Sequence, residues 1–320
     1  MKENIFVRHN KKKWLKYEKE IKHLSTLSTQ RIADLYQDVT ADLSYSQSQF
    51  PESRVTSYLN NMALSLHDYV YTPRKTDFIR STIHFFSYVI PKYVAEARFE
   101  FRLSFIIFLS FTIVGVILAV QDMENIIDTL GPGYVNMTLE NIKNGVPTDV
   151  YGNSNETDMF LFIALNNLRV DITTYSYGVI PILGPGYIMM KNGIMLGEFQ
   201  TLFFLNGVGF QSMTAIWIHG TIEISTIIIG GAASLALGLG WIFPKTYSRK
   251  EALKRSALRS IKIFISIIPL TILAAFFESF ITRHTEYPLF VKLLIIFGSL
   301  AFIIFYYVIL PNKIRKEEEL

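Results

Sequence analysis

Continuous apolar runs, each close to the roughly 20 residues that cross a bilayer as a helix, constrain this sequence most. The first run covers residues 103–120, reads LSFIIFLSFTIVGVILAV and contains no charged side chain. A membrane barrel would instead show short segments of alternating polarity. The sequence therefore predicts an all-α polytopic membrane protein.

The distribution of charge predicts the orientation of these runs. The first 102 residues contain sixteen Lys and Arg, whereas residues 121–158 contain one basic and seven acidic residues. Because basic loops stay in the cytoplasm, we expect residues 1–101 to be cytoplasmic and an outer loop at 121–171. The basic loop at 244–262 is also expected inside, so an even number of crossings must separate it from the N-terminal region.

Parity leads to about six spans, with both chain ends in the cytoplasm of a bacterium and the spans in its inner membrane. Residues 199–218 either cross or form a re-entrant segment, because Asn206 and Gln211 make this run polar in its middle. The short apolar segment that precedes Arg169 and Asp171 is expected to rest on the outer surface. The predicted spans are 103–120, 173–196, 199–218, 221–243, 263–282 and 289–310, followed by a cytoplasmic tail at 311–320.

Residues 1–101 have the pattern of amphipathic helices. Apolar side chains recur at three- and four-residue intervals among lysines, for example at Ile32, Leu35, Val39 and Leu43. The segment before the first span resembles a helix lying at the membrane surface. The chain is therefore divided into a cytoplasmic and membrane-surface helical region at 1–101 and a transmembrane domain at 102–310.

Ionisable residues inside two spans are the main functional signal, because charged groups in hydrocarbon are costly. His219 and Glu223 occur at the predicted outer end of one span, and Glu278 lies about one turn from the outer end of another. His284 follows just beyond it. We therefore predict a polar cluster of these four residues in the outer leaflet.

Small residues recur every four positions along the helix that carries Glu223. Such ladders let helices approach closely, and they also suit a homodimer. The predicted helix-packing residues are Gly220, Thr226, Gly230, Ser234 and Gly238.

Three roles for the polar cluster stay open: packing between helices, a proton- or ion-linked function, and catalysis such as metal-assisted hydrolysis. HGTIE places His219 four residues before Glu223 but provides no second metal ligand nearby, so no metal site and no cofactor are predicted. The absence of cysteine excludes disulfides and thiolate sites. A glycine- and proline-broken span at Pro181, Gly184 and Pro185 favours transport, since interrupted helices often form binding sites in transporters.

The order HGTIEISTIIIGGAASLALG, a basic loop and AAFFESFIT resembles the stage II sporulation protein M family, as do KNGIMLG and the N-terminal helices. The resemblance singles out His219, Gly220, Glu223 and Glu278. It implies a membrane protein that anchors peptidoglycan-degrading partners during engulfment, or envelope and stress assemblies that include MoxR-type ATPases and von Willebrand factor A-type proteins. The long N-terminal region distinguishes this chain from the family's namesake.

We therefore expect a non-enzymatic membrane protein that anchors envelope-associated protein partners. Its other partners would be membrane lipids, and the positive charge is not taken as evidence for nucleic acid. The alternatives are a transporter or channel for a small solute, ion or lipid, and a membrane-embedded hydrolase.

Overall fold

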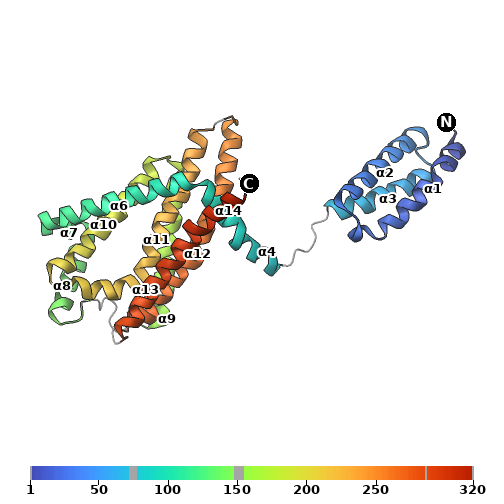
Figure 1. The fold of residues 1–320 in the computed structure, drawn as a ribbon. Helices are drawn as coiled ribbons and strands as arrows, with labels where there is room; N and C mark the ends of the chain where they lie inside the picture. The colour runs from blue at the N-terminus through green and yellow to red at the C-terminus, as the bar shows by residue number, and fades with distance from the viewer. Residues whose placement is uncertain (1, 72–77, 148–154, 245, 285–286, 319–320) are drawn as a thin grey trace. The chain divides into compact units, whose positions relative to one another are not determined.

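The computed structural model describes residues 2–71, 78–147, 155–244, 246–284 and 287–318. Within these residues the regular structure is helical, without a strand, which confirms the all-α prediction (Figure 1). The chain forms two compact units, Met1–Ser81 and Thr82–Leu320.

The first unit contains three antiparallel amphipathic helices, α1 (Glu3–Ile21), α2 (Thr29–Gln49) and α3 (Arg54–Tyr71). Their apolar faces form one core, in which the side chains of Leu35 and Leu66 are completely buried. This unit has its own core, as an independently folding domain requires.

Polar groups at the edge of this core join α1 to α2. The indole of Trp14 donates to Asp42 at 2.7 Å, and the Tyr17 hydroxyl donates to Asp38. Arg31 on α2 pairs with Glu20 on α1 at 2.8 Å.

Within its described residues, the second unit contains four helical segments that are long and apolar enough to cross a membrane. The elements are α6 (Arg98–Gln121), α11 (Gly209–Ile242), α12 (Arg249–Phe277) with its π-helical extension η4 (Glu278–Thr282), and α13 (Leu289–Ile304) with η5 (Phe305–Ile309) and α14 (Leu310–Glu318). α13 buries none of its side chains within the described chain, as expected for a lipid-facing helix. These features support the membrane location.

Two further helices lie beside these four. α9 (Glu156–Ser176) runs antiparallel to α12, because Glu156 lies beside His284 and Tyr175 bonds Ser260. α10 (Leu183–Leu205) runs parallel to α6 and antiparallel to α11. Six helices of the described chain therefore alternate in direction, and the predicted bilayer crossing by residues 173–196 stays a prediction.

The segment before Asp171, which we expected to rest on the outer surface, forms the first part of α9, and α9 packs lengthwise against α11 and α12. Two of the polar side chains that interrupt its apolar run face those helices: Asn167 bonds Glu223, and Asp171 bonds Thr271. Because these groups have partners, they do not prevent the helix from joining the bundle. The predicted outer loop at 121–171 therefore contains most of α9, together with α7 (Met123–Leu130) and α8 (Pro132–Lys143).

The predicted boundaries between 173 and 243 also need correction. Residues 199–218 are not a separate or re-entrant segment, because they contain the end of α10, a turn and the start of α11. The turn falls at Gly207, whose φ of 79° favours glycine. Much of the predicted cytoplasmic loop at 244–262 is helical as well, since α12 begins at Arg249 with Ser248 as its N-cap.

The proline- and glycine-rich break joins two helices and does not interrupt the middle of one. Pro181 lies in the connection between α9 and α10, whereas Gly184 and Pro185 lie in the first turn of α10. The connection also contains a short 3₁₀ turn, η3 (Tyr177–Val179). This corrects the predicted broken span at 173–196.

Candidate functional site

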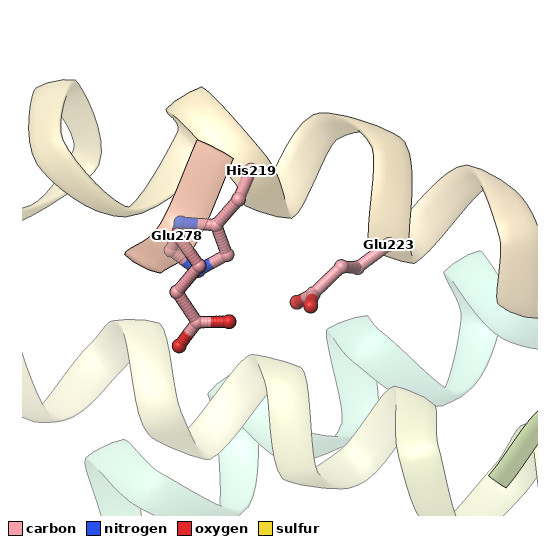
Figure 2. A group of neighbouring side chains, drawn as sticks. All are labelled: His219, Glu223 and Glu278. Atoms are coloured by element: carbon pink, nitrogen blue, oxygen red, sulfur yellow. The ribbon is translucent and has the colours of Figure 1, made fainter. Parts of the chain in front are cut away.

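His219, Glu223 and Glu278 form a compact polar cluster between two antiparallel helices. His219 and Glu223 are four residues apart and therefore project from the same face of α11. Glu278 begins η4, at the end of α12. One ligand-type atom from each side chain lies within 4.8 Å of the other two, and Figure 2 shows both carboxylates and one ring nitrogen directed toward a common point.

Small residues bring these two helices together. Ala274 and Ala275, which precede Glu278 by four and three positions, are fully buried. Gly230 on α11 faces Ile267 on α12, and Gly240 faces Ser256 further along the same pair. The antiparallel packing therefore places the C-terminal end of α12 beside the middle of α11.

Hydrogen bonds from neighbouring groups hold Glu223 and His219. Asn167 on α9 donates its side-chain N–H to Oε1 of Glu223. Nδ1 of His219 lies 2.9 Å from the Thr282 hydroxyl, at the end of η4. The cluster therefore joins α9, α11 and α12 with its extension η4.

A cavity of about 400 Å³ lies beside the cluster. His219, Gly220 and Glu223 contribute to its wall from α11, and Asn192 and Tyr134 add polar groups from α10 and α8. The remaining wall is mainly apolar. The site thus combines convergent polar groups with enough space for a small ligand.

Two carboxylates in such close proximity cannot both be ionised in an apolar environment without a compensating positive charge. His219 and Glu278 are 8% and 7% exposed, and Glu223 is half-buried. The compensating charge can be a proton, an imidazolium or a bound cation. The cluster is therefore suited to binding cations or protons as well as to packing.

The structure does not place His284, the fourth residue of the predicted cluster, with the other three. Its Nε2 lies 3.3 Å from Oε1 of Glu156, in the first turn of α9. The connection after η4 carries this ring toward α9. His284 therefore lies at the end of the α9–α12 pair.

The predicted packing residues occupy two different surroundings. Thr226, Gly230, Ser234 and Gly238 are buried, and the last two lie against η3 and its neighbours. A Cβ at Gly238 would come within 2.8 Å of the Gly178 carbonyl oxygen, so the backbones here approach as closely as glycine permits. Gly220 instead faces the cavity, where a Cβ would meet only Ile216 at 3.7 Å.

Several polar residues of the bundle were missed by the sequence analysis. Asp171 accepts a hydrogen bond from Thr271, Asn167 contacts Glu223, and Glu198 on α10 is 1% exposed. Their signal in the sequence was the same as that of Glu223, a polar side chain within an apolar run. Close contact between α6 and α10 was missed as well, although Gly193 and Gly197 have the four-residue spacing typical of such contacts.

Comparisons with known proteins give two matches. A family model described as "Stage II sporulation protein M" matches residues 104–283, and a model described as a domain of unknown function matches residues 4–72. No curated protein and no solved structure matches the chain.

Proposed function

Since its matched region covers more than half of the sequence, this chain belongs to the stage II sporulation protein M family, and on that premise we propose that it is a non-enzymatic membrane scaffold. Its helical bundle anchors the chain in the bacterial inner membrane. Its N-terminal unit binds protein partners of the envelope on the cytoplasmic side. Such partners take part in peptidoglycan remodelling or in membrane and stress assemblies.

The observation that carries this proposal is the presence of two separately packed units in one chain. The N-terminal unit has a complete core of its own. It corresponds closely to the second matched region, residues 4–72. A soluble domain attached to a membrane bundle is the simplest construction for holding a partner at a membrane.

The surface of the N-terminal unit is suited to protein contact. Leu15 is 49% exposed and Leu64 is 50% exposed, although both belong to helices that bury other apolar side chains. Lys11, Lys12 and Lys13 add a basic run on α1. An apolar centre surrounded by a polar rim is the usual composition of an interface between proteins.

The polar cluster has a packing role in this proposal. Asn167, Glu223, His219 and Thr282 form contacts that connect three helices. Interhelical hydrogen bonds of this kind contribute about 0.6–2 kcal/mol each in membranes. The cluster would therefore keep the anchor in one arrangement.

A deletion experiment tests the proposal. Native membranes that contain either the full chain or a variant lacking residues 2–72 are chemically cross-linked, and the attached proteins are quantified by mass spectrometry. We expect defined envelope proteins with the full chain and their loss with the deletion, while both proteins remain in the membrane. Equal recovery of the same proteins with both chains would contradict the proposal.

The orientation is testable separately, because the chain contains no cysteine. Single cysteines at Leu15 and at Asn144, on the two predicted sides, are treated with a membrane-impermeant maleimide on intact spheroplasts. We expect labelling at residue 144 alone. Labelling at residue 15 under the same conditions would place the N-terminal unit outside.

A second candidate function is transport of a small solute or ion. The cavity of about 400 Å³ beside His219 and Glu223 favours it, because transporters bind substrates at polar groups within the membrane. Flux into proteoliposomes would be lost in Glu223→Gln and retained in Thr173→Val, whose side chain bonds only its own helix. Absence of flux for cations, protons and small polar solutes in the wild type would remove this candidate.

A further inference from the structure

We propose that His219, Glu223 and Glu278 bind one divalent transition-metal ion, for which Zn²⁺ is the best match. This inference goes beyond the scaffold function and is independent of it. It rests on the donor atoms, their support by neighbouring groups, their combined charge and the adjacent cavity.

The donor atoms are those that Zn²⁺ binds. Imidazole nitrogen and carboxylate oxygen coordinate Zn²⁺ at about 2.0–2.2 Å. The three candidate atoms lie within 4.8 Å of one another, whereas ligands of one such ion would lie about 3.3–4 Å apart. Small side-chain rotations therefore close the site, since Glu223 and Glu278 each have several rotatable bonds.

His219 is oriented for this role by Thr282. When Nδ1 carries the hydrogen, it donates to the Thr282 hydroxyl at 2.9 Å, and Nε2 presents its lone pair to the two carboxylates. Figure 2 shows one nitrogen of the ring on the side of these carboxylates. A hydrogen bond to the second ring nitrogen is the usual support of a metal-binding histidine.

Glu223 has similar support from Asn167. The amide donates to Oε1, which orients the carboxylate and leaves Oε2 available to an ion. Carboxylates that bind metals are commonly held by such bonds. His219 and Glu223 are therefore positioned before an ion arrives.

The charge of the cluster matches a divalent ion. A neutral imidazole and two carboxylates carry a total charge of −2, so one divalent cation gives a neutral site. Neutrality is strongly favoured where helices cross an apolar medium. A monovalent cation would leave a net negative charge.

The cavity provides the open part of the coordination sphere. His219 and Glu223 contribute to a space of about 400 Å³, which is large enough for water. Three protein ligands with a water molecule at the fourth position form a common arrangement around Zn²⁺. The proposed site is therefore of the open type.

Metal binding by the purified full-length protein is the test. The protein in detergent is stripped with a chelator, then titrated with Zn²⁺, and bound metal is measured after desalting. In parallel, Co²⁺ replaces Zn²⁺ as a spectroscopic probe. We expect one equivalent per chain, visible Co²⁺ absorption bands, and an increase in the unfolding temperature when Zn²⁺ is restored.

Variants distinguish this site from other metal binding. His219→Gln, Glu223→Gln and Glu278→Gln should each lose the bound equivalent, and Thr282→Val should weaken it about 10- to 100-fold, as loss of a supporting bond does. Glu198→Gln is the matched control, because it removes a buried carboxylate outside the cluster. It should bind like the wild type.

Two results would overturn the proposal. One is equal uptake of Zn²⁺ by the wild type and by the variant with all three ligands replaced. The other needs no variant: wild-type protein that gives no Co²⁺ absorption bands beyond those of the free ion does not contain this site.

Discussion

Asp171 on α9 accepts a hydrogen bond from the hydroxyl of Thr271 on α12, 100 residues further along the chain. The two residues are 3% and 1% exposed. This contact and the Asn167–Glu223 bond lie one helical turn apart on α9. Together they attach α9 to both α11 and α12.

Thr271→Val should destabilise the protein by about 1–3 kcal/mol, because it leaves a buried carboxyl group without its donor. The substitution preserves side-chain shape, so little of the effect comes from packing. Unfolding in detergent with increasing denaturant measures it. Thr173→Val is the control, since this hydroxyl bonds the backbone of its own helix at the exposed face. Equal stability of both variants would show that the interhelical bond contributes nothing.

Gly197→Ala should destabilise the contact between α6 and α10 by about 1–3 kcal/mol, the usual effect of overpacking. Its Cβ would lie 2.2 Å from the carbonyl oxygen of Thr112, so the helices must separate. Gly186→Ala is the matched control on the same helix, because nothing lies within 4 Å of its added Cβ. The unfolding temperatures of the two variants should differ clearly. Similar unfolding temperatures would contradict close packing at Gly197.

Arg259→Met should reduce stability by about 1.5–3 kcal/mol, the usual contribution of a hydrogen bond to a charged group. Nη2 of Arg259 lies 2.6 Å from Oε1 of Glu100, and the carboxylate side chain is 9% exposed. This pair joins α12 to the start of α6.

Arg255→Met provides the comparison on the same helix. Arg255 pairs with Glu251 one turn away and lies over the ring of Tyr247. Both members of the ion pair are exposed, so the loss of Arg255 should change stability by at most about 1 kcal/mol. Denaturant titrations of both variants measure the difference. An equal loss of stability in the two variants would mean that the pair formed by Arg259 behaves as a surface ion pair.

The N-terminal unit should lose stability at alkaline pH. Burial, with the hydrogen bond to Asp38, raises the pKa of Tyr17 to about 12, from a usual value of 10.0. Because the folded state retains the proton longer than the unfolded state does, stability contributed by Tyr17 is complete below pH 10 and falls up to about pH 12.

Circular dichroism of residues 2–71 during denaturation between pH 8 and pH 12 measures this dependence. Tyr17→Phe should show a smaller decrease over that range. Burial also raises the pKa of Tyr58, so part of the decrease should remain. An unchanged pH dependence in the Phe variant would contradict the role of Tyr17.

Part of the site could be predicted from the sequence. Charge bias and the order of apolar runs were sufficient to place Glu223 and Glu278 at similar depth, because antiparallel helices of consecutive runs pack side by side. His284 could not be assigned in the same way. It lies in a connection, where the direction of a side chain depends on the neighbouring α9 and not on helical periodicity.

The helix boundaries were harder to predict from the sequence, for a physical reason. Apolar side chains continue on both sides of Asn206 and Gly207, and glycine occurs frequently within membrane helices, so composition does not mark this turn. α9 was expected at the outer surface because its apolar run is short and is interrupted by polar residues. Whether a polar side chain within an apolar run faces solvent or a neighbouring helix depends on tertiary packing.

The central claim is that the N-terminal unit holds a protein partner while the bundle anchors the chain. Photo-reactive residues are introduced at the exposed positions Leu15 and Leu64, and at Phe105 on α6 as a position expected to face lipid. After illumination of cells, we expect discrete protein adducts from at least one of the first two positions and none from Phe105. Adducts absent from both Leu15 and Leu64, at expression equal to that of the Phe105 variant, would contradict it.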